Sequence, residues 1–105
     1  MLNDAGSAKK LMAVEWLKAE LLSEEGDLFR ALINGPEDRI LDALAGVLIT
    51  TYTLGQRLGI SPPRLEDRAI QRLNRSLSED QELEEWFGDL NRLARYLGRR
   101  DGKPM

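Results

Sequence analysis

The sequence predicts an all-α fold, a bundle of four helices completed by dimerisation. No segment sustains the alternation of apolar and polar residues that a half-buried strand needs. Apolar residues instead recur at offsets of three, four and seven along most of the chain, which is typical of amphipathic helices. Clusters of glycine, proline and serine separate these periodic segments and mark the turns between helices.

The first two helices follow from this spacing and from the residues that interrupt it. The first is expected over residues 7–33, with a seam of Leu17, Leu21, Leu28 and Leu32. Gly35 suits a left-handed C-cap, and Pro36 suits the first position of the next helix. The second helix is expected to continue to Leu58 and to stop at Gly59.

Two further helices are expected in the second half of the chain. The third starts at "SPP", residues 61–63, and its apolar seam comprises Leu65, Ala69, Leu73 and Leu77. A capping box at residues 78–81 predicts the start of the fourth, which ends at Gly98. Its early acids and late arginines suit the helix dipole. Its inward residues are Leu83, Trp86, Phe87, Leu90, Leu93 and Leu97, the two aromatics being expected in the core, and residues 99–105 are expected to be a frayed tail.

The composition narrows the class of function. The 105 residues suffice for a single domain, expected over residues 1–105. A formal net charge of -3 and a pI near 5.0 argue against a nucleic-acid-binding protein, which needs a basic surface. The chain has no cysteine and no histidine, so disulfides, thiolate or imidazole metal sites, cysteine nucleophiles and Ser-His-Asp triads are excluded. Any catalysis must use carboxylates, arginines, lysines, hydroxyls and a hard metal ion.

The sequence also gives an expectation about location. The N-terminal segment lacks the apolar region of a secretory signal. The longest uncharged run extends from Ala43 to Gln56, fourteen residues, fewer than the about 18 that suggest a membrane span. A cytoplasmic protein without a membrane partner is therefore expected.

The second helix has two faces, and both lack charge over this run. One face carries Ile40, Leu44, Val47, Leu48, Thr51 and Leu58, and the opposite side carries the small residues Ala43, Gly46, Thr50 and Thr53. Such a helix needs burial on nearly all sides. We expect the small-residue side to pack against a second subunit in a symmetric homodimer. The alternative is a helix that lies centrally within one chain.

Acidic residues gather in the first helix and suggest a metal site. Glu20, Glu24 and Asp27 share one side of the helix, at spacings of four and three. Glu25 lies instead among leucines and a phenylalanine, where an unpaired carboxylate is costly. Two acids one turn apart can hold Mg²⁺ jointly, because this hard ion takes oxygen ligands. The alternative is a solvated acidic face.

Arginines line the third helix in the same periodic way. Arg64, Arg68, Arg72 and Arg75 fall within one stripe, which could bind phosphates through bidentate hydrogen bonds. The alternative is again a solvated face, since Glu66 and Asp67 are nearby. Acids and arginines together would suit metal-dependent phosphate chemistry.

Residues 13–77 resemble the MazG-like family of the all-α nucleoside triphosphate pyrophosphohydrolases. That family carries E-E-x-x-E in its first helix, and E-x-x-D in its second, followed by an apolar run that ends in "RLGI". The segment "SEEGDLFRALINGPEDRILDALAGVLITTYTLGQRLGIS" follows this plan. The resemblance places Glu24 and Asp27 at the E-x-x-E pair, with Ser23 at the place of the first glutamate. It also places Arg72 and Arg75 near basic nucleotide-contacting positions, with Arg68 as a further candidate.

The second motif departs from the family pattern. Gly46 stands at the aspartate position and Ala43 at the glutamate position. Asp42, one residue earlier, is rotated by about 100° and is expected to point elsewhere. The resemblance implies that active relatives use four carboxylates to hold Mg²⁺, with Mn²⁺ as a substitute, and release a nucleoside monophosphate and pyrophosphate. Here it implies metal ligation by Glu24 and Asp27, with Glu20 and Glu25 as further candidates.

Three hypotheses about function follow. In the first, the metal site is degenerate and the chain is a dimeric scaffold or a weak nucleotide-binding module with little or no catalysis. In the second, it is an active Mg²⁺-dependent nucleoside triphosphate pyrophosphohydrolase that gains the missing acids from a partner subunit. In the third, it is a structural interaction protein, and apolar packing fills the former cleft.

Overall fold

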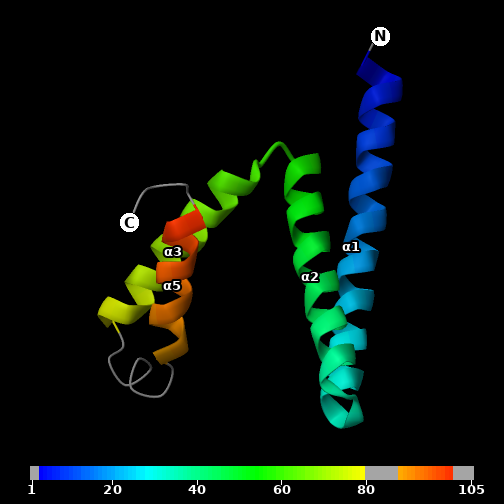
Figure 1. Ribbon diagram of the computed structural model, residues 1–105. Helices are drawn as coiled ribbons and strands as arrows, with labels where there is room; N and C mark the ends of the chain where they lie inside the picture. Colours follow the sequence, from blue (N-terminus) through cyan, green and yellow to red (C-terminus); the bar gives the residue numbers. More distant parts are fainter. Residues whose placement is uncertain (1–2, 80–87, 101–105) are drawn as a thin grey trace. The chain divides into compact units, whose positions relative to one another are not determined.

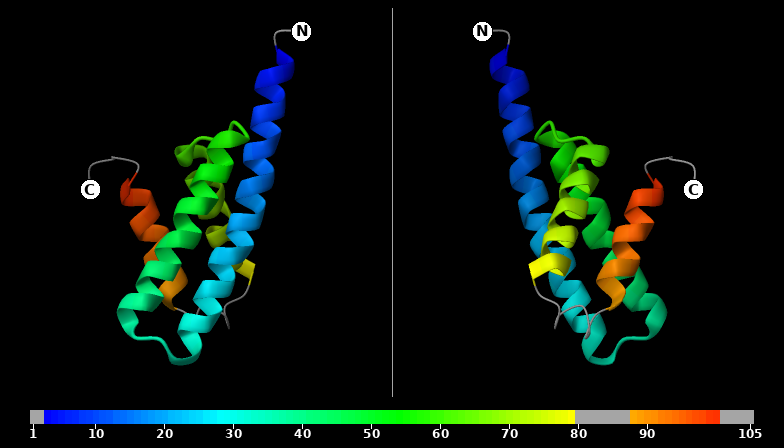
Figure 2. Two further views of the ribbon diagram at one scale, coloured as in Figure 1. Left: turned by 90° about the vertical axis from the view of Figure 1, so that its right-hand side faces the viewer. Right: turned by 90° about the vertical axis from the view of Figure 1, so that its left-hand side faces the viewer.

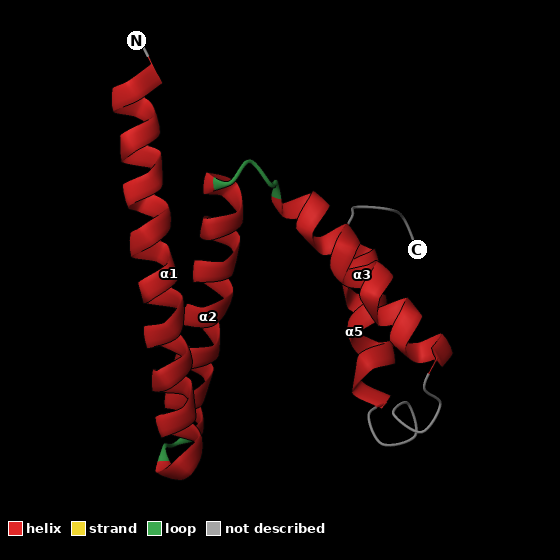
Figure 3. Ribbon diagram, turned by 180° about the vertical axis from the view of Figure 1, so that it is seen from behind, coloured by secondary structure: helices red, strands yellow, loops and turns green. Residues whose placement is uncertain are grey.

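Periodic apolar residues and short breaks produce helices throughout the part of the chain that the structure describes. The computed structural model describes residues 3–79 and 88–100, which form four helices without a strand (Figures 1 and 3). The chain divides into two compact units, residues 1–61 and residues 62–105. This confirms the expected all-α class.

The first unit is an antiparallel hairpin of two helices. Helix α1 spans Asn3–Asn34 and helix α2 spans Glu37–Arg57. Leu17 and Ala31 of α1 are buried against α2, and the longer α1 extends beyond the end of α2 toward its own N-terminus (Figure 2). Of the predicted seam of α1, Leu17 is buried and Leu21 and Leu28 are half-buried, whereas Leu32 is 57% exposed and its neighbour Ala31 packs against α2 instead.

The two ends of α2 differ in detail from the expectation. Pro36 is the N-cap in extended conformation, with φ -69° and ψ 162°, and is not the first helical residue. Gly35 is not left-handed; a Cβ there would lie 2.6 Å from the carbonyl oxygen of Ala31, so the tight turn itself requires glycine. Gly59 ends α2 as expected, with φ 85°.

The small-residue side of α2 packs within the chain, which corrects the expectation that it meets a second subunit. Ala43 and Thr50 are each only 7% exposed, because both lie against α1. Small side chains allow this close approach of two helix backbones. The opposite side of α2 is the exposed one, with Leu44 at 49% and Leu48 at 56%.

The second unit pairs α3, which spans Pro62–Glu79, with α5, which spans Gly88–Arg100. Ser78 lies in the last turn of α3, so the capping box does not start a helix at this residue. Arg99 and Arg100 are helical, so the frayed tail does not begin at residue 99. Leu83, Trp86, Phe87 and residues 101–105 lie outside the described residues.

None of the helices in the described part of the chain combines the length and the apolar character that a membrane span requires.

Candidate functional site

An acidic hollow opens on one side of the α1–α2 groove. Glu24 and Asp27 of α1 line it together with Arg39, Asp42 and Ala43 of α2, and its volume is about 270 Å³. Residues three or four apart share one face of a helix, so successive turns of α1 and α2 bring these side chains to the same side of the groove. The space between Ala43 and the two predicted ligands is therefore an open polar hollow, as binding would require, and is not filled by apolar packing.

Gly46 allows the carboxylate of Glu24 to lie directly on the backbone of α2. A Cβ at position 46 would overlap Oε2 of Glu24 and would lie 2.7 Å from its Cδ. The Glu24 carboxylate therefore occupies space that any larger residue at position 46 would take. This contact places Glu24, a predicted metal ligand of α1, against Gly46 of α2, a position where the sequence has no carboxylate.

The surroundings of Glu24 favour its protonated form. Partial burial raises the pKa of Glu24 above its ordinary value of 4.5, and the negative charges of Glu20, Asp27 and Asp42 raise this pKa further. A hydrogen bond with Glu20 acts in the same direction. A bound cation would offset this repulsion, since an opposite charge nearby stabilises the carboxylate form.

Asp42 contributes to the hollow, contrary to the expectation that it points elsewhere. It lines the same space as Glu24 and Asp27 and affects the pKa of Glu24. The sequence does contain a signal for this position: Asp42 lies four residues before Gly46, so both residues share one face of α2. The expectation was wrong because it rested on the rotation of about 100° between Asp42 and Ala43 and not on the face that Asp42 shares with Gly46.

Two arginines accompany these acids. Arg30 donates a hydrogen bond from Nη2 to Oδ1 of Asp27 at 2.5 Å, one turn away on α1. Arg39 projects from α2 into the lining of the acidic hollow. Part of the negative charge at the site is thus balanced by the protein itself, a feature that the sequence reasoning also missed.

A second hollow lies beside the first along the same groove and has more apolar walls. It also has a volume of about 270 Å³, and Glu24 lines both hollows. Its lining comprises Trp16, Leu17, Glu20, Glu24, Gly46, Ile49, Thr50 and Thr53. Thr53 donates its hydroxyl to the carbonyl oxygen of Ile49, whereas the buried Thr50 hydroxyl has no hydrogen-bond partner among the described residues. This hollow offers an indole face, carboxylates and a buried hydroxyl.

The predicted metal ligands are thus only partly brought together. Glu24 and Asp27 line the acidic hollow, whereas Glu20 lines the neighbouring one. Glu25 lines neither hollow. Among the residues that the structure describes, no three acidic side chains are placed so that they could hold a metal ion. Their oxygen chemistry suits Mg²⁺, but their arrangement does not make a complete magnesium site.

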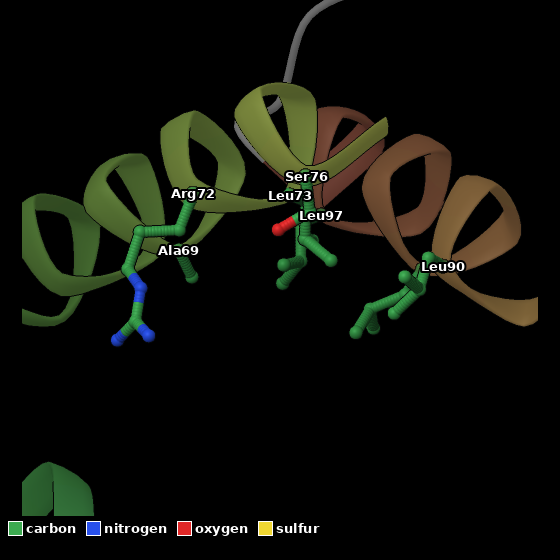
Figure 4. Close-up of a pocket in the computed structure, with 7 residues that line it drawn as sticks. Ala69, Arg72, Leu73, Ser76, Leu90 and Leu97 are labelled. Atoms are coloured by element: carbon green, nitrogen blue, oxygen red, sulfur yellow. The ribbon is translucent and has the colours of Figure 1, made fainter. Parts of the chain in front are cut away.

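The predicted phosphate-binding arginines belong to the other unit. Arg68, Arg72 and Arg75 are exposed on α3. Arg72 lies at one end of an apolar groove of about 310 Å³ between α3 and α5, and Leu90 lies at the other end (Figure 4). The remaining lining residues are Ala69, Leu73, Ser76, Leu93 and Leu97, which confirms contact between the predicted seams of these two helices.

Comparison with protein-family models shows to which family the chain belongs. The model of the MazG-like family matches residues 7–90, most of the chain. The chain belongs to the MazG-like family. Neither the curated proteins nor the solved structures yield a match. The match includes both helices of the hairpin and therefore both hollows of the MazG-like groove.

Proposed function

We propose that this MazG-like protein binds nucleoside triphosphates weakly, together with Mg²⁺, and hydrolyses them little or not at all. One observation carries the proposal: Glu24 lies on Gly46, at the point where the family pattern has an aspartate. The second helix thus supplies no carboxylate at either motif position. Ala43 lines the acidic hollow but offers it no oxygen ligand.

The groove nevertheless retains features that suit a metal-bound nucleotide. Glu24, Asp27 and Asp42 keep negative charge at one hollow, and a triphosphate can complete the coordination of Mg²⁺ with its own oxygens. The neighbouring hollow has the right size for part of a nucleotide and presents the ring of Trp16, on which a planar base can stack. Mn²⁺ would serve in place of Mg²⁺.

Low turnover follows from the same arrangement. Phosphoryl chemistry depends mainly on charge stabilisation by precisely held metal ions and cations. An incomplete ligand set leaves the metal loosely positioned, and Arg30 already pairs with Asp27. Phosphate binding by Arg72 and Arg75, with Arg68, stays a prediction from the sequence, because these arginines belong to the other unit. The protein then acts as a dimeric scaffold or sensor in the cytoplasm.

Asp42 favours a second candidate, an active pyrophosphohydrolase. It supplies α2 with a carboxylate on the face of Gly46, four residues before the position where the family pattern has its aspartate. A small rearrangement of Glu24 and Arg39 on metal binding would then give three acids around one ion. This candidate differs from the first in one property, the release of pyrophosphate.

Calorimetric titration tests the proposed binding. Ribo- and deoxynucleoside triphosphates are titrated into the protein with Mg²⁺ and without it. We expect weak binding that requires the metal and is lost in Glu24→Gln, because that substitution removes a ligand charge while conserving shape. Asp38→Asn, a neutralisation at an exposed position of α2 away from both hollows, is the matched control and should bind like the unmodified chain. Absence of binding, or equal loss in the control, would refute the proposal.

A further inference from the structure

Thr50 differs from the other threonines that follow it on α2. Thr51 and Thr53 each donate their hydroxyl to the carbonyl oxygen four residues earlier, at 2.8 Å. Thr50 is only 7% exposed, and its hydroxyl has no hydrogen-bond partner among the described residues. A buried polar group without a partner is unfavourable and calls for a ligand or an ordered water. Because Thr50 lines the second hollow, its hydroxyl is available to a molecule bound there.

The register of the hairpin places Glu20 across the groove from this hydroxyl. Glu24 lies on Gly46. In an antiparallel pair of helices, four residues back along α1 correspond to four residues forward along α2. Glu20 therefore faces Thr50, and both residues line the second hollow. A group bound between them can contact the carboxylate and the hydroxyl together.

Hydrogen-bond acceptors predominate in the second hollow. Among the described residues that line it, the charged side chains are those of Glu20 and Glu24, which a hydrogen bond joins. A carboxylate has about four acceptor positions, so Glu20 keeps acceptor capacity beyond this bond. A ligand that presents N–H donors is therefore complementary to the second hollow, whereas a carbonyl oxygen at the same place is repelled by the carboxylates.

The walls of the second hollow suit a flat ring. Trp16 is 64% exposed and offers an indole face, and Leu17 and Ile49 add apolar contacts. The volume of about 270 Å³ lies below the about 300–1,000 Å³ of pockets for drug-sized ligands, so one ring system fits better than a whole nucleotide. Glu24 lines both hollows, and a ring bound here lies next to the acidic hollow.

We infer that the second hollow selects nucleotides whose base carries an amino group, and that Glu20 is the residue that recognises this group. The 4-amino group of cytosine or the 6-amino group of adenine donates one hydrogen bond to Glu20 and one to the hydroxyl of Thr50, while the ring stacks on Trp16. Uracil and hypoxanthine have a carbonyl oxygen at this position. The inference rests on the proposed function, because it concerns the base of the same bound nucleotide.

Matched pairs of nucleotides test the inference by calorimetric titration of the full-length protein with Mg²⁺. CTP has an amino group where UTP has a carbonyl oxygen, and ATP differs from ITP in the same way. We expect CTP and ATP to bind about tenfold more tightly than UTP and ITP, respectively. The reason is that a carbonyl oxygen meets the carboxylate of Glu20 and leaves that acceptor without a donor.

Substitutions separate recognition of the amino group from stacking. Glu20→Gln conserves shape, but its amide can also donate to a carbonyl oxygen, so the affinity ratio within each pair should fall toward one. Thr50→Val removes the hydroxyl and should lower this ratio, with circular dichroism to verify that the variant is helical. Trp16→Leu should weaken all four nucleotides alike and leave the ratio unchanged. Glu15→Gln, at an exposed position of α1 outside both hollows, is the matched control and should keep the ratio of the unmodified chain.

The outcomes distinguish this inference from the proposed function. Equal affinities within each pair would overturn the inference and leave nucleotide binding intact. A ratio that Glu20→Gln or Thr50→Val leaves unchanged, or that Glu15→Gln lowers equally, would also overturn it. Absence of binding for all four nucleotides would refute the proposed function, and the inference with it.

Discussion

At the scale of residues, Gly46 determines what the groove contains. Any side chain at this position would compete with the carboxylate of Glu24 for the same space. Glycine in a helix interior is unfavourable by about 0.5–1 kcal/mol relative to alanine. The helix nevertheless has glycine here, and the consequence is an acid of α1 resting on α2 among three other carboxylates.

The charge of Glu24 should make stability depend on pH. Its pKa is raised in the folded protein, so the folded state holds the proton more tightly than the unfolded state does. Stability therefore falls as pH rises from the ordinary value of 4.5 through the folded-state pKa. In the absence of metal, we expect the unfolding free energy of Glu24→Gln to increase relative to that of the unmodified chain as the pH rises from 4.5 to 7.

Urea unfolding of both proteins across this range measures the effect. Asp38→Asn again provides the control, since Asp38 lies away from the acidic hollow. A difference between Glu24→Gln and the unmodified chain that stays constant with pH would show that the neighbouring carboxylates do not act on Glu24.

At the scale of elements, the end of α2 depends on one backbone conformation. Gly59 has φ 85°, a left-handed conformation that costs a residue with a Cβ about 1–2 kcal/mol. Nothing lies within 4 Å of a Cβ built there, so backbone conformation alone sets the cost. We expect Gly59→Ala to lower the unfolding free energy by about 1 kcal/mol.

Chemical denaturation measures this loss in unfolding free energy, and substitution of a glycine inside a helix provides the comparison. Gly26 lies inside α1 without a positive φ, and a Cβ there meets only the flexible end of Arg30. Gly26→Ala should therefore stabilise the protein by about 0.5–1 kcal/mol. Equal effects of the two substitutions would contradict the proposed role of Gly59.

The helices themselves were predictable, because apolar spacing and glycine or proline breaks act locally. Gly59 was correctly expected to stop α2. The neighbours of each helix face were less predictable. Small residues on α2 suggested a subunit interface, but the structure packs Ala43 and Thr50 against α1. A sequence pattern shows that a face is buried and does not show which helix covers it.

The candidate site was predictable to a similar extent. Glu24 and Asp27 were found from spacing and resemblance, and both line the hollow. Asp42 was wrongly expected to point elsewhere and Arg39 was not considered, because the contribution of both depends on how two helices face each other. The Arg30 hydrogen bond to Asp27, in contrast, joins residues three apart on α1, so the sequence did contain a local signal for it.

At the scale of the whole molecule, the two sides of the hairpin suggest a division of roles. One side carries the two hollows with the acids, and the opposite side of α2 carries the exposed Leu44 and Leu48. In the proposed function, ligand binding is confined to the side with the hollows.

The measurement that tests the central claim most directly is pyrophosphate release. Ribo- and deoxynucleoside triphosphates are incubated with the protein and Mg²⁺, then with Mn²⁺, beside an Asp27→Asn variant prepared in the same way. The proposed function predicts no release above that of the variant, because Ala43 and Gly46 stand at the two motif positions of α2. Turnover that Asp27→Asn abolishes would contradict the account and would show that Asp42 or a partner subunit supplies the missing acids.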